Sequence, residues 1–531
     1  MPASVSLHQL SWSTPDNQPL FSGLEVSFGN ERTGLIGRNG TGKSSLLRII
    51  AGNLQPATGS VTVQGSIGML NQSVQISPDN TVGDHLGVAG ELARLDRLEQ
   101  GLGSVEDAGE ADWTLPGRIE TALADAGLPG YAPDRPLATL SGGQRTRLAL
   151  AGLILAAPDI ILLDEPTNNL DAEGRQAVIG LLHQWRGAAI VVSHDRALLR
   201  EMDAIVELTT LRATRYGGNW DHFAERKALE LAAAENELNS AERKVAAIDR
   251  KIQAVAEKKA RKDGAGKRKA AKGDIPKIML GGMKDNSEKT SGENARLANR
   301  LRGDAAEAAS DARAKIEILT PLSVTLTPTG LPSGRMVLQA DRLTGGSDQA
   351  APIIRDLSLQ LIGPERVAIT GPNGSGKTTL LRLLTGALPA VSGTARILVP
   401  HAMLDQTVSL LDPTLSIRDN FRALNPDADE KTCRSALARF MFRADAALQQ
   451  AGTLSGGEML RAGLACTIGG NNPPQLLILD EPTNHLDIHA VEQVEAGLRG
   501  YDGALLVVSH DADFLAAIGI VRTIALPMNG V

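Results

Sequence analysis

Short runs of apolar residues, each followed by a glycine or a polar residue, recur in both halves of this chain of 531 residues. They lie at 35–36, 160–163 and 191–192 in the first half, and at 476–479 and 507–508 in the second. Runs of this kind are typical of strands buried in a mainly parallel sheet. The pattern predicts two α/β domains, one in each half of the chain.

The region between these two sets of strands has a helical pattern. From Phe223 to Lys262 the residues favour helix, and the glycines of DGAG at 263–266 are expected to break this helix. A second helical stretch at 293–319 is expected to return antiparallel along the first. At about 1.5 Å per residue, the first helix is expected to project on the order of 60 Å. Heptad spacing predicts one coiled-coil seam at Leu231, Ala234, Leu238, Ala241, Val245, Ile248, Ile252 and Val255.

The same motifs occur in the same order in each half. The first half contains GRNGTGKS (37–44), Gln72, LSGGQ (140–144), IILLDEPTNNLD (160–171) and VVSHD (191–195). The second contains GPNGSGKT (371–378), Gln406, LSGGE (454–458), LLILDEPTNHLD (476–487) and VVSHD (507–511). The Lys-to-Gln spacing is 29 residues in both copies, and the acidic pairs and histidines are offset by 316. Whole domains are therefore duplicated.

The glycine-rich motif predicts a nucleotide site in each domain. A turn of this kind between a strand and a helix lets backbone N–H groups cradle phosphates where the helix dipole favours anions. Its lysine then reaches the β- and γ-phosphates. The nucleotide-binding residues expected here are Gly37, Arg38, Asn39, Gly40, Thr41, Gly42, Lys43, Ser44 and Ser45, and Gly371, Pro372, Asn373, Gly374, Ser375, Gly376, Lys377, Thr378 and Thr379.

The remaining motifs predict ATP hydrolysis with Mg²⁺. Ser44 and Thr378 supply a hydroxyl for the ion, and Asp164 and Asp480, at the ends of apolar runs, hold the same ion. One residue further on, Glu165 and Glu481 are placed to polarise the attacking water. His194 and His510 are expected near the γ-phosphate, because they follow the next strand. A histidine in this position is usually a surface or core residue, but its place within VVSHD favours the functional interpretation.

Together these motifs resemble those of the ATP-binding cassette ATPases, in which the signature Ser-Gly-Gly of one domain closes over ATP held by the other. The resemblance implies that Ser455, Gly456 and Gly457 face the site of Lys43, and that Ser141, Gly142 and Gly143 face the site of Lys377. A serine opening a helix also presents free N–H groups that suit a γ-phosphate. Gln72 and Gln406 are expected in these sites as catalytic residues and Mg²⁺ ligands. Trp12 can stack on adenine or pack in a core, and the sequence leaves both alternatives open.

Composition narrows the class of protein. The only cysteines, Cys433 and Cys466, have no metal-ligand spacing, so a reducing cytoplasm is expected. The sequence contains no run of about 18 apolar residues, so no membrane span is predicted.

The segment between Ala241 and Arg302 is basic, with 18 Lys/Arg against 8 Asp/Glu, within a chain of net charge −7. Such a run is often a solvated helix face, but its place at the end of a long helix favours a polyanion, with RNA as the leading choice. The RNA-binding candidates are Lys258, Lys259, Arg261, Lys262, Lys267, Arg268, Lys269, Lys272 and Lys277.

Tandem cassettes joined by a basic helical hairpin resemble the ABC-F family of ribosome-acting ATPases, and so does the segment YGGNW at 216–220. The resemblance implies a closed, ATP-bound state in the ribosomal tRNA exit site, a linker that points toward the P-site tRNA and the peptidyl transferase centre, and release on hydrolysis. It also implies ribosomal RNA and tRNA as partners, and a monomer whose two cassettes pair with each other. Both a translation factor and an antibiotic-protection protein fit this description.

The predicted domains are a first cassette at 1–221, a basic hairpin linker at 222–320 with its tip near 264–292, and a second cassette at 321–531. The distance from Lys43 to Ser141 exceeds that from Lys377 to Ser455 by 20 residues, which predicts a short arm near 87–113.

Two other classes of protein contain the same cassettes. A transporter ATPase subunit has no use for a basic hairpin, and DNA-directed ATPases usually carry zinc modules or far longer coiled coils.

Overall fold

The structure is a computed structural model. It describes residues 2–526 apart from 71–79, 169, 210–211, 271–299, 301–302, 304–306, 308–309, 311–325, 347, 349 and 485. The chain separates into two compact units, one made of 1–221 with 321–531 and the other of 222–320. The first unit contains both cassettes, and the second contains the linker.

The first cassette is built on a six-stranded sheet of order β5-β6-β7-β3-β8-β9, with a separate three-stranded antiparallel sheet of order β2-β1-β4. In the larger sheet only β9 runs antiparallel to its neighbour. Its strands are β1 Ser4–Ser13, β2 Pro19–Phe28, β3 Arg32–Ile36, β4 Thr58–Gln64, β5 Ile67–Leu70, β6 Ile160–Asp164, β7 Ala188–Val192, β8 Ala204–Leu208 and β9 Ala213–Gly217. Its helices are α1 Lys43–Ile50, α2 Val82–His85, α3 Ala89–Glu99, α4 Val105–Glu110, α5 Leu115–Asp125, α6 Gly142–Ala156, α7 Ala172–Gln184 and α8 Arg196–Leu199.

The second cassette repeats this architecture. Its five-stranded sheet, of order β14-β15-β16-β12-β17, is parallel throughout, and the order β11-β10-β13 forms the antiparallel sheet. The strands are β10 Met336–Gly345, β11 Ile354–Ile362, β12 Arg366–Thr370, β13 Ser392–Ile397, β14 His401–Leu404, β15 Leu476–Asp480, β16 Ala504–Val508 and β17 Arg522–Ala525. The helices are α11 Lys377–Leu384, α12 Ile417–Leu424, α13 Glu430–Arg439, α14 Gly456–Ile468, α15 Ile488–Arg499 and α16 Ala512–Ala517.

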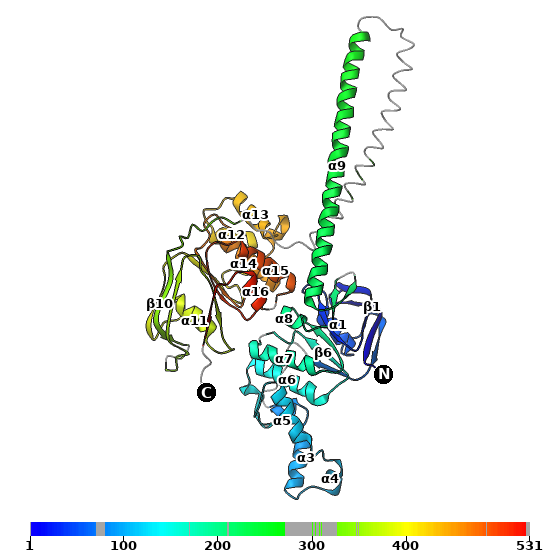
Figure 1. The fold of residues 1–531 in the computed structure, drawn as a ribbon, viewed down its shortest axis with the longest axis vertical. Coiled ribbons are helices and arrows are strands. Elements are labelled where there is room, and N and C mark those ends of the chain that lie inside the picture. The colour runs from blue at the N-terminus through cyan, green and yellow to red at the C-terminus, as the bar shows by residue number, and fades with distance from the viewer. Residues whose placement is uncertain are drawn as a thin grey trace. The chain divides into compact units, whose positions relative to one another are not determined.

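The predicted fold class is confirmed, because the apolar runs are the central strands of both parallel sheets. Every residue of β6, β7, β15 and β16 is buried. Helices and antiparallel strands cover the sheets (Figure 1). Strands covered on both faces need apolar residues at every position, which explains why these segments lack a polar alternation. The order of the central strands brings the carboxyl ends of β3, β6 and β7 together, and those of β12, β15 and β16.

The linker begins with one long helix, α9, at Trp220–Ala270. Residues 231, 234, 238, 241, 245 and 248 of the predicted seam are buried or half-buried, which agrees with the heptad pattern. The side chains of Ile252 and Val255, most of the second helical stretch and most of the tip lie outside the described residues. At about 1.5 Å per residue, 51 residues give a length on the order of 75 Å rather than 60 Å.

The sequence predicted a break in this helix at the DGAG segment, and that prediction is wrong. The helix continues through Gly264 and Gly266 to Ala270. Each glycine costs a helix about 1 kcal/mol relative to alanine, but it keeps the backbone N–H that proline lacks. Lysines, arginines and alanines on both sides favour helix, so the two glycines lower helix stability without ending the helix.

Residues 87–113 of the first cassette contain α3 and α4, which lie beyond α5 (Figure 1). Two arginines of α3 hold the two helices together, and one of them, Arg97, lies 3.3 Å from Asp107 of α4. Arg94 lies 3.0 Å from Glu91 of its own helix, and 3.4 and 3.2 Å from Asp107 and Glu110 of the other. This region coincides with the expected arm near 87–113, whose role as an arm stays a prediction.

Candidate functional site

The two glycine-rich loops have nearly the same geometry. The amine of Lys43 donates to the carbonyls of Gly37 and Arg38 at 2.7 and 3.0 Å. Lys377 makes the equivalent bonds at 2.8 and 3.1 Å. Each lysine is preceded by a glycine with φ near 90°, a conformation that a residue with a Cβ rarely adopts. Burial lowers the pKa of both amines, and nearby carboxylates oppose this shift.

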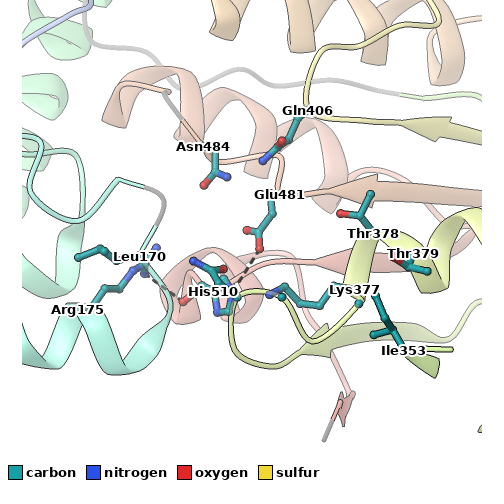
Figure 2. A pocket seen from close by; sticks show the side chains of 13 residues that line it. Leu170, Arg175, Ile353, Lys377, Thr378, Thr379, Gln406, Glu481, Asn484 and His510 are labelled. Carbon is teal, nitrogen blue, oxygen red and sulfur yellow. Dashed lines mark hydrogen bonds and ion pairs between the residues drawn. The ribbon is translucent and has the colours of Figure 1, made fainter. Parts of the chain in front are cut away.

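A cavity lies at each loop, and the cavity at the second cassette takes residues from both cassettes. Its volume is about 340 Å³, and Lys377, Thr378, Gln406 and Glu481 line it. Figure 2 shows Leu170 and Arg175 of the first cassette on the opposite side. The cavity at the first loop has about 270 Å³ and is lined by Leu20, Asn39, Gly40, Gly42, Lys43, Ser44, Ser45, Glu165 and Val192.

The acidic residues that end β6 and β15 provide oxygen ligands beside the loops. Ser44 Oγ donates to Asp164 Oδ1 at 3.1 Å. In the second cassette, Thr378 acts on the carboxyl of Asp480 and lowers its pKa, which opposes the effect of burial. Burial raises the pKa of both aspartates. Oδ1 of Asp480 is buried without a hydrogen-bond partner among the described residues. A hydroxyl, a carboxylate and phosphate oxygens suit Mg²⁺, which prefers few protein ligands together with substrate phosphates. These residues therefore fit the predicted ion, whose role is to neutralise phosphate charge.

The next residue turns its carboxylate toward the cavity because the backbone bends there. Glu165 and Glu481 both have φ of 48°, and their amides donate to the carbonyls of Val192 and Val508 on the adjacent strand at 2.9 Å. A left-handed conformation costs a non-glycine residue free energy, and strained residues of this kind cluster at functional sites. The strand-end sequence alone does not reveal this bend.

Each of these glutamates faces the predicted histidine. Oε1 of Glu165 lies 3.3 Å from Nε2 of His194, and the distance from Glu481 to His510 is 3.4 Å. Burial raises the pKa of both glutamates, to about 7 for Glu481. It lowers the pKa of both histidines, to about 4 for His510. The histidines are therefore neutral near pH 7, so each can donate one hydrogen bond and accept another.

Two aspartates that the sequence motifs did not predict as site residues join the cassettes. Oδ2 of Asp487 accepts from the amide of Asn39 at 2.8 Å, and Oδ2 of Asp171 accepts from the amide of Asn373 at 3.2 Å. The other oxygen of each aspartate caps its own helix, α15 or α7. The signal available in the sequence was an N-cap aspartate after DEPTNxL. A capping role alone predicts no contact with the opposite cassette.

The signature segments lie elsewhere. Ser141 and Ser455 cap α6 and α14, each in a capping box with the residue three positions later. Neither serine, nor the glycines that follow it, is among the residues that line the two cavities. Each glycine-rich loop thus meets an aspartate of the opposite cassette, while contact between signature and nucleotide stays a prediction.

Two of three further predicted positions can be placed. Gln406 lines the cavity of the second cassette (Figure 2), whereas Gln72 lies outside the described residues. Trp12 pairs with Phe21 in the antiparallel sheet and packs against the core of the first cassette, and it does not line either cavity.

Of the RNA-binding candidates, Arg261 is exposed on α9. The side chains of the others on α9, and Lys272 and Lys277 entirely, lie outside the described residues. The candidates on α9 with undescribed side chains are Lys258, Lys259, Lys262, Lys267, Arg268 and Lys269.

Ion pairs add to the contact between the cassettes. Arg196 NH1 lies 2.6 Å from Glu495, and both side chains are almost fully buried. Arg200 holds both oxygens of Asp513 at 2.7 and 3.0 Å. Arg196 is the first residue of α8, immediately after the VVSHD motif of the first cassette, and Arg200 follows the end of this helix. The acids come from the second cassette.

We expect Arg196→Met to lower the free energy of unfolding by about 3 kcal/mol, because it leaves the carboxylate of Glu495 buried without its arginine. Adding Glu495→Leu should recover most of this loss. Urea unfolding of the full chain measures both effects. Arg499→Met is the control, because Arg499 is exposed and 3.8 Å from Glu495. Equal effects of the two arginine changes would mean that the buried pair contributes nothing.

Comparison with known proteins agrees with this geometry. The family described as ABC transporter matches residues 24–168 and 354–484, which together make up more than half of the chain. The tylosin resistance ATP-binding protein TlrC of Streptomyces fradiae is 33% identical over 96% of this chain and 95% of its own length. The energy-dependent translational throttle protein EttA of Mycobacterium tuberculosis is 33% identical over 91% and 84%. The ATP-binding protein Uup of Escherichia coli is 30% identical over 96% and 78%.

Solved structures show the same fold. The ribosome recycling factor aABCE1, in its complex with the archaeal ribosomal stalk protein aP1, matches 97% of this chain and 87% of its own, with a TM-score of 0.55 and 19% identity. In the part of this chain that the structure describes, no helix has the length and apolar character needed to cross a membrane. With its duplicated motifs, its paired nucleotide cavities and relatives that match nearly its whole length, the chain belongs to the ABC-F family of tandem ATP-binding cassette ATPases and hydrolyses ATP.

Proposed function

We propose that this protein binds the ribosome in its ATP-bound, closed state, reaches toward tRNA and the peptidyl transferase centre with its linker, and is released by ATP hydrolysis. The proposal places it in the cytoplasm as a monomer whose cassettes pair with each other. The observation that carries the proposal is the length of the match to TlrC, because 96% of the chain cannot be matched without the linker. The printed names of TlrC and EttA describe drug resistance and control of translation.

In this proposal the residues of the two cavities perform the chemistry. Lys43 and Lys377 hold the phosphates, while Glu165 and Glu481 orient water and accept its proton. The oxygens of Asp164 and Asp480 would hold Mg²⁺. ATP brings the signature serines of the opposite cassettes over the γ-phosphates, so closure requires nucleotide in both sites.

Sedimentation tests the ribosome proposal against its alternatives. Lysate is layered on sucrose with a non-hydrolysed ATP analogue or with ADP, and the protein is followed by immunoblot. We expect it to travel with ribosomes only when the analogue is present. Migration with membranes would indicate a transporter subunit, and DNase-sensitive migration with chromosomal DNA would indicate a DNA-directed ATPase. Drug susceptibility of a deletion strain, with and without plasmid rescue, then distinguishes antibiotic protection from a housekeeping role.

The basic end of α9 is expected to contact RNA phosphates. Each phosphate contact contributes about one unit to the slope of log affinity against log salt. Changing Lys267, Arg268 and Lys269 to glutamine should therefore flatten that slope by about two to three units. Binding of the ATP-locked protein to ribosomes at several salt concentrations measures the slope.

Three exposed arginines of the cassettes provide the matched control, because Arg186, Arg335 and Arg396 lie outside the linker. Their change to glutamine removes the same charge and should leave the slope nearly unaltered. ATP hydrolysis without ribosomes should be similar in both triple variants. An unchanged slope in the linker variant would show that its three charges form a solvated helix face.

A further inference from the structure

One arginine of the first cassette lies in the nucleotide cavity of the second. Arg175 is in the first turn of α7, four residues after Asp171, which accepts the amide of Asn373. Its side chain lines the second cavity with Lys377 and Glu481. NH1 of Arg175 donates to the backbone carbonyl of His510 at 3.1 Å, as the dashed line in Figure 2 shows. Arg175 of the first cassette thus contacts the segment that carries the histidine of the second site.

The same guanidinium also contacts the histidine segment of the first site. Nε of Arg175 lies 3.5 Å from Oδ2 of Asp195, the residue that follows His194. Only 21% of the Arg175 side chain and 11% of the Asp195 side chain are exposed, so water screens this pair weakly. The second carboxylate oxygen of Asp195 caps α8 by accepting from Ala197 and Leu198, which fixes the carboxylate.

The position equivalent to Arg175 in the second cassette carries an apolar residue. The offset of 316 residues places Val491 at the position equivalent to Arg175. Val491 is 4% exposed and belongs to the apolar core of the second cassette, so it cannot donate a hydrogen bond to the segment of His194. The two nucleotide sites are therefore built differently, although their motifs are nearly the same.

We propose that Arg175 is a positioning residue that couples the two nucleotide sites by holding the histidine segments of both cassettes with one guanidinium. When nucleotide binds at the first site and shifts the segment of His194 and Asp195, it moves the carboxylate that pairs with Arg175. Arg175 then moves the carbonyl of His510. A guanidinium suits this role because NH1 donates a hydrogen bond to the carbonyl of His510 while its positive charge pairs with the carboxylate of Asp195. Coupling of binding is reciprocal, so nucleotide at the second site changes affinity at the first by the same factor.

The test measures the coupling factor without ribosomes, so its failure is distinguishable from failure of the proposed ribosomal function. The probe is Mg²⁺ with a non-hydrolysed ATP analogue, titrated by calorimetry into the full chain. Lys43→Ala leaves only the second site able to bind, and Lys377→Ala leaves only the first. The ratio of the affinity of both sites together to the product of the two single-site affinities gives the coupling factor.

We expect a coupling factor within the usual range of about 5 to 150 with Arg175 present, and a value near one with Arg175→Leu. Arg175→Lys keeps the charge but lacks the several N–H donors of a guanidinium, so it should give an intermediate coupling factor. This variant replaces Arg175→Leu in the test if the leucine variant does not fold. The first-site affinity, measured with Lys377→Ala, should change by less than about twofold. Arg186→Leu, an exposed change in the same cassette, should leave the factor unaltered.

Three results would overturn the inference. The first is a coupling factor near one in the unaltered chain, and the second is a factor that persists in both Arg175 variants. The third is an equal loss of affinity at both single sites with the factor unchanged, which would give Arg175 a purely structural role in the contact between the cassettes.

Discussion

Replacement of both Glu165 and Glu481 by glutamine is expected to lower ATP turnover by about 10²-fold or more while Mg-ATP binding stays near normal. Each carboxylate lines a nucleotide cavity, and the backbone bend at φ 48° directs it there. An amide of the same shape cannot accept a proton from water, whereas both glycine-rich loops and both aspartates remain. Phosphate release and equilibrium nucleotide binding measure the two quantities separately.

Because ATP would then persist in both sites, the double variant should stay closed, remain on ribosomes in sedimentation and arrest a cell-free translation reaction. Glu99→Gln with Glu120→Gln is the matched control, since both side chains are exposed on helices of the first cassette. Unreduced turnover in the Glu165 and Glu481 variant would remove the role assigned to the carboxylates. If the variant loses ATP turnover but translation stays normal, the result would argue against binding to the ribosome.

Ser455→Arg should lower turnover at the site of Lys43 by about 10²-fold, although the two residues are 412 positions apart. Ser455 caps α14, and its neighbouring amides are the donors expected to meet the γ-phosphate when the cassettes close. A large side chain at this position would hold the signature away from the nucleotide. Glu481→Gln serves as the background, because it silences the other site and leaves turnover at the first site visible.

Ser141→Arg in the same background is the control, since the resemblance assigns that serine to the site of Lys377. It should reduce turnover at the first site much less than Ser455→Arg does. Equal effects would mean that either arginine blocks closure as a whole. No effect of Ser455→Arg would show that each cassette hydrolyses ATP without the opposite signature.

The sequence predicted well those features that depend on neighbouring residues. Fully apolar runs predicted the central strands, and the spacing of 3 and 4 predicted the seam of α9, since both patterns reflect local backbone geometry. The predicted break at DGAG was wrong, because the helix-forming residues around Gly264 and Gly266 outweigh the preference of glycine for less regular conformations. The helix preference of a segment is a sum over all its residues, and two glycines were not enough to end the helix.

The sequence by itself therefore determined the chemistry of each cassette. A glycine-rich loop before Lys43, an acidic pair at a strand end and a histidine after the next strand specify phosphate, metal and water contacts. They do so because parallel strands bring their carboxyl ends to one edge of a sheet. The duplication could also be recognised from the sequence, because the repeat preserves the order of the motifs and the spacing between them.

Only the tertiary structure decided which residues meet across the cassettes. The contacts of Asp487 with Asn39, of Asp171 with Asn373, and of Arg175 with His510 join positions 448, 202 and 335 residues apart. No local periodicity encodes such pairs, because their distance depends on how two separately folded domains pack. The two nucleotide sites differ because Arg175 lies at one and Val491 is in the equivalent position of the other. The sequence shows this difference, but only the interface between the cassettes shows that it changes a contact of the site.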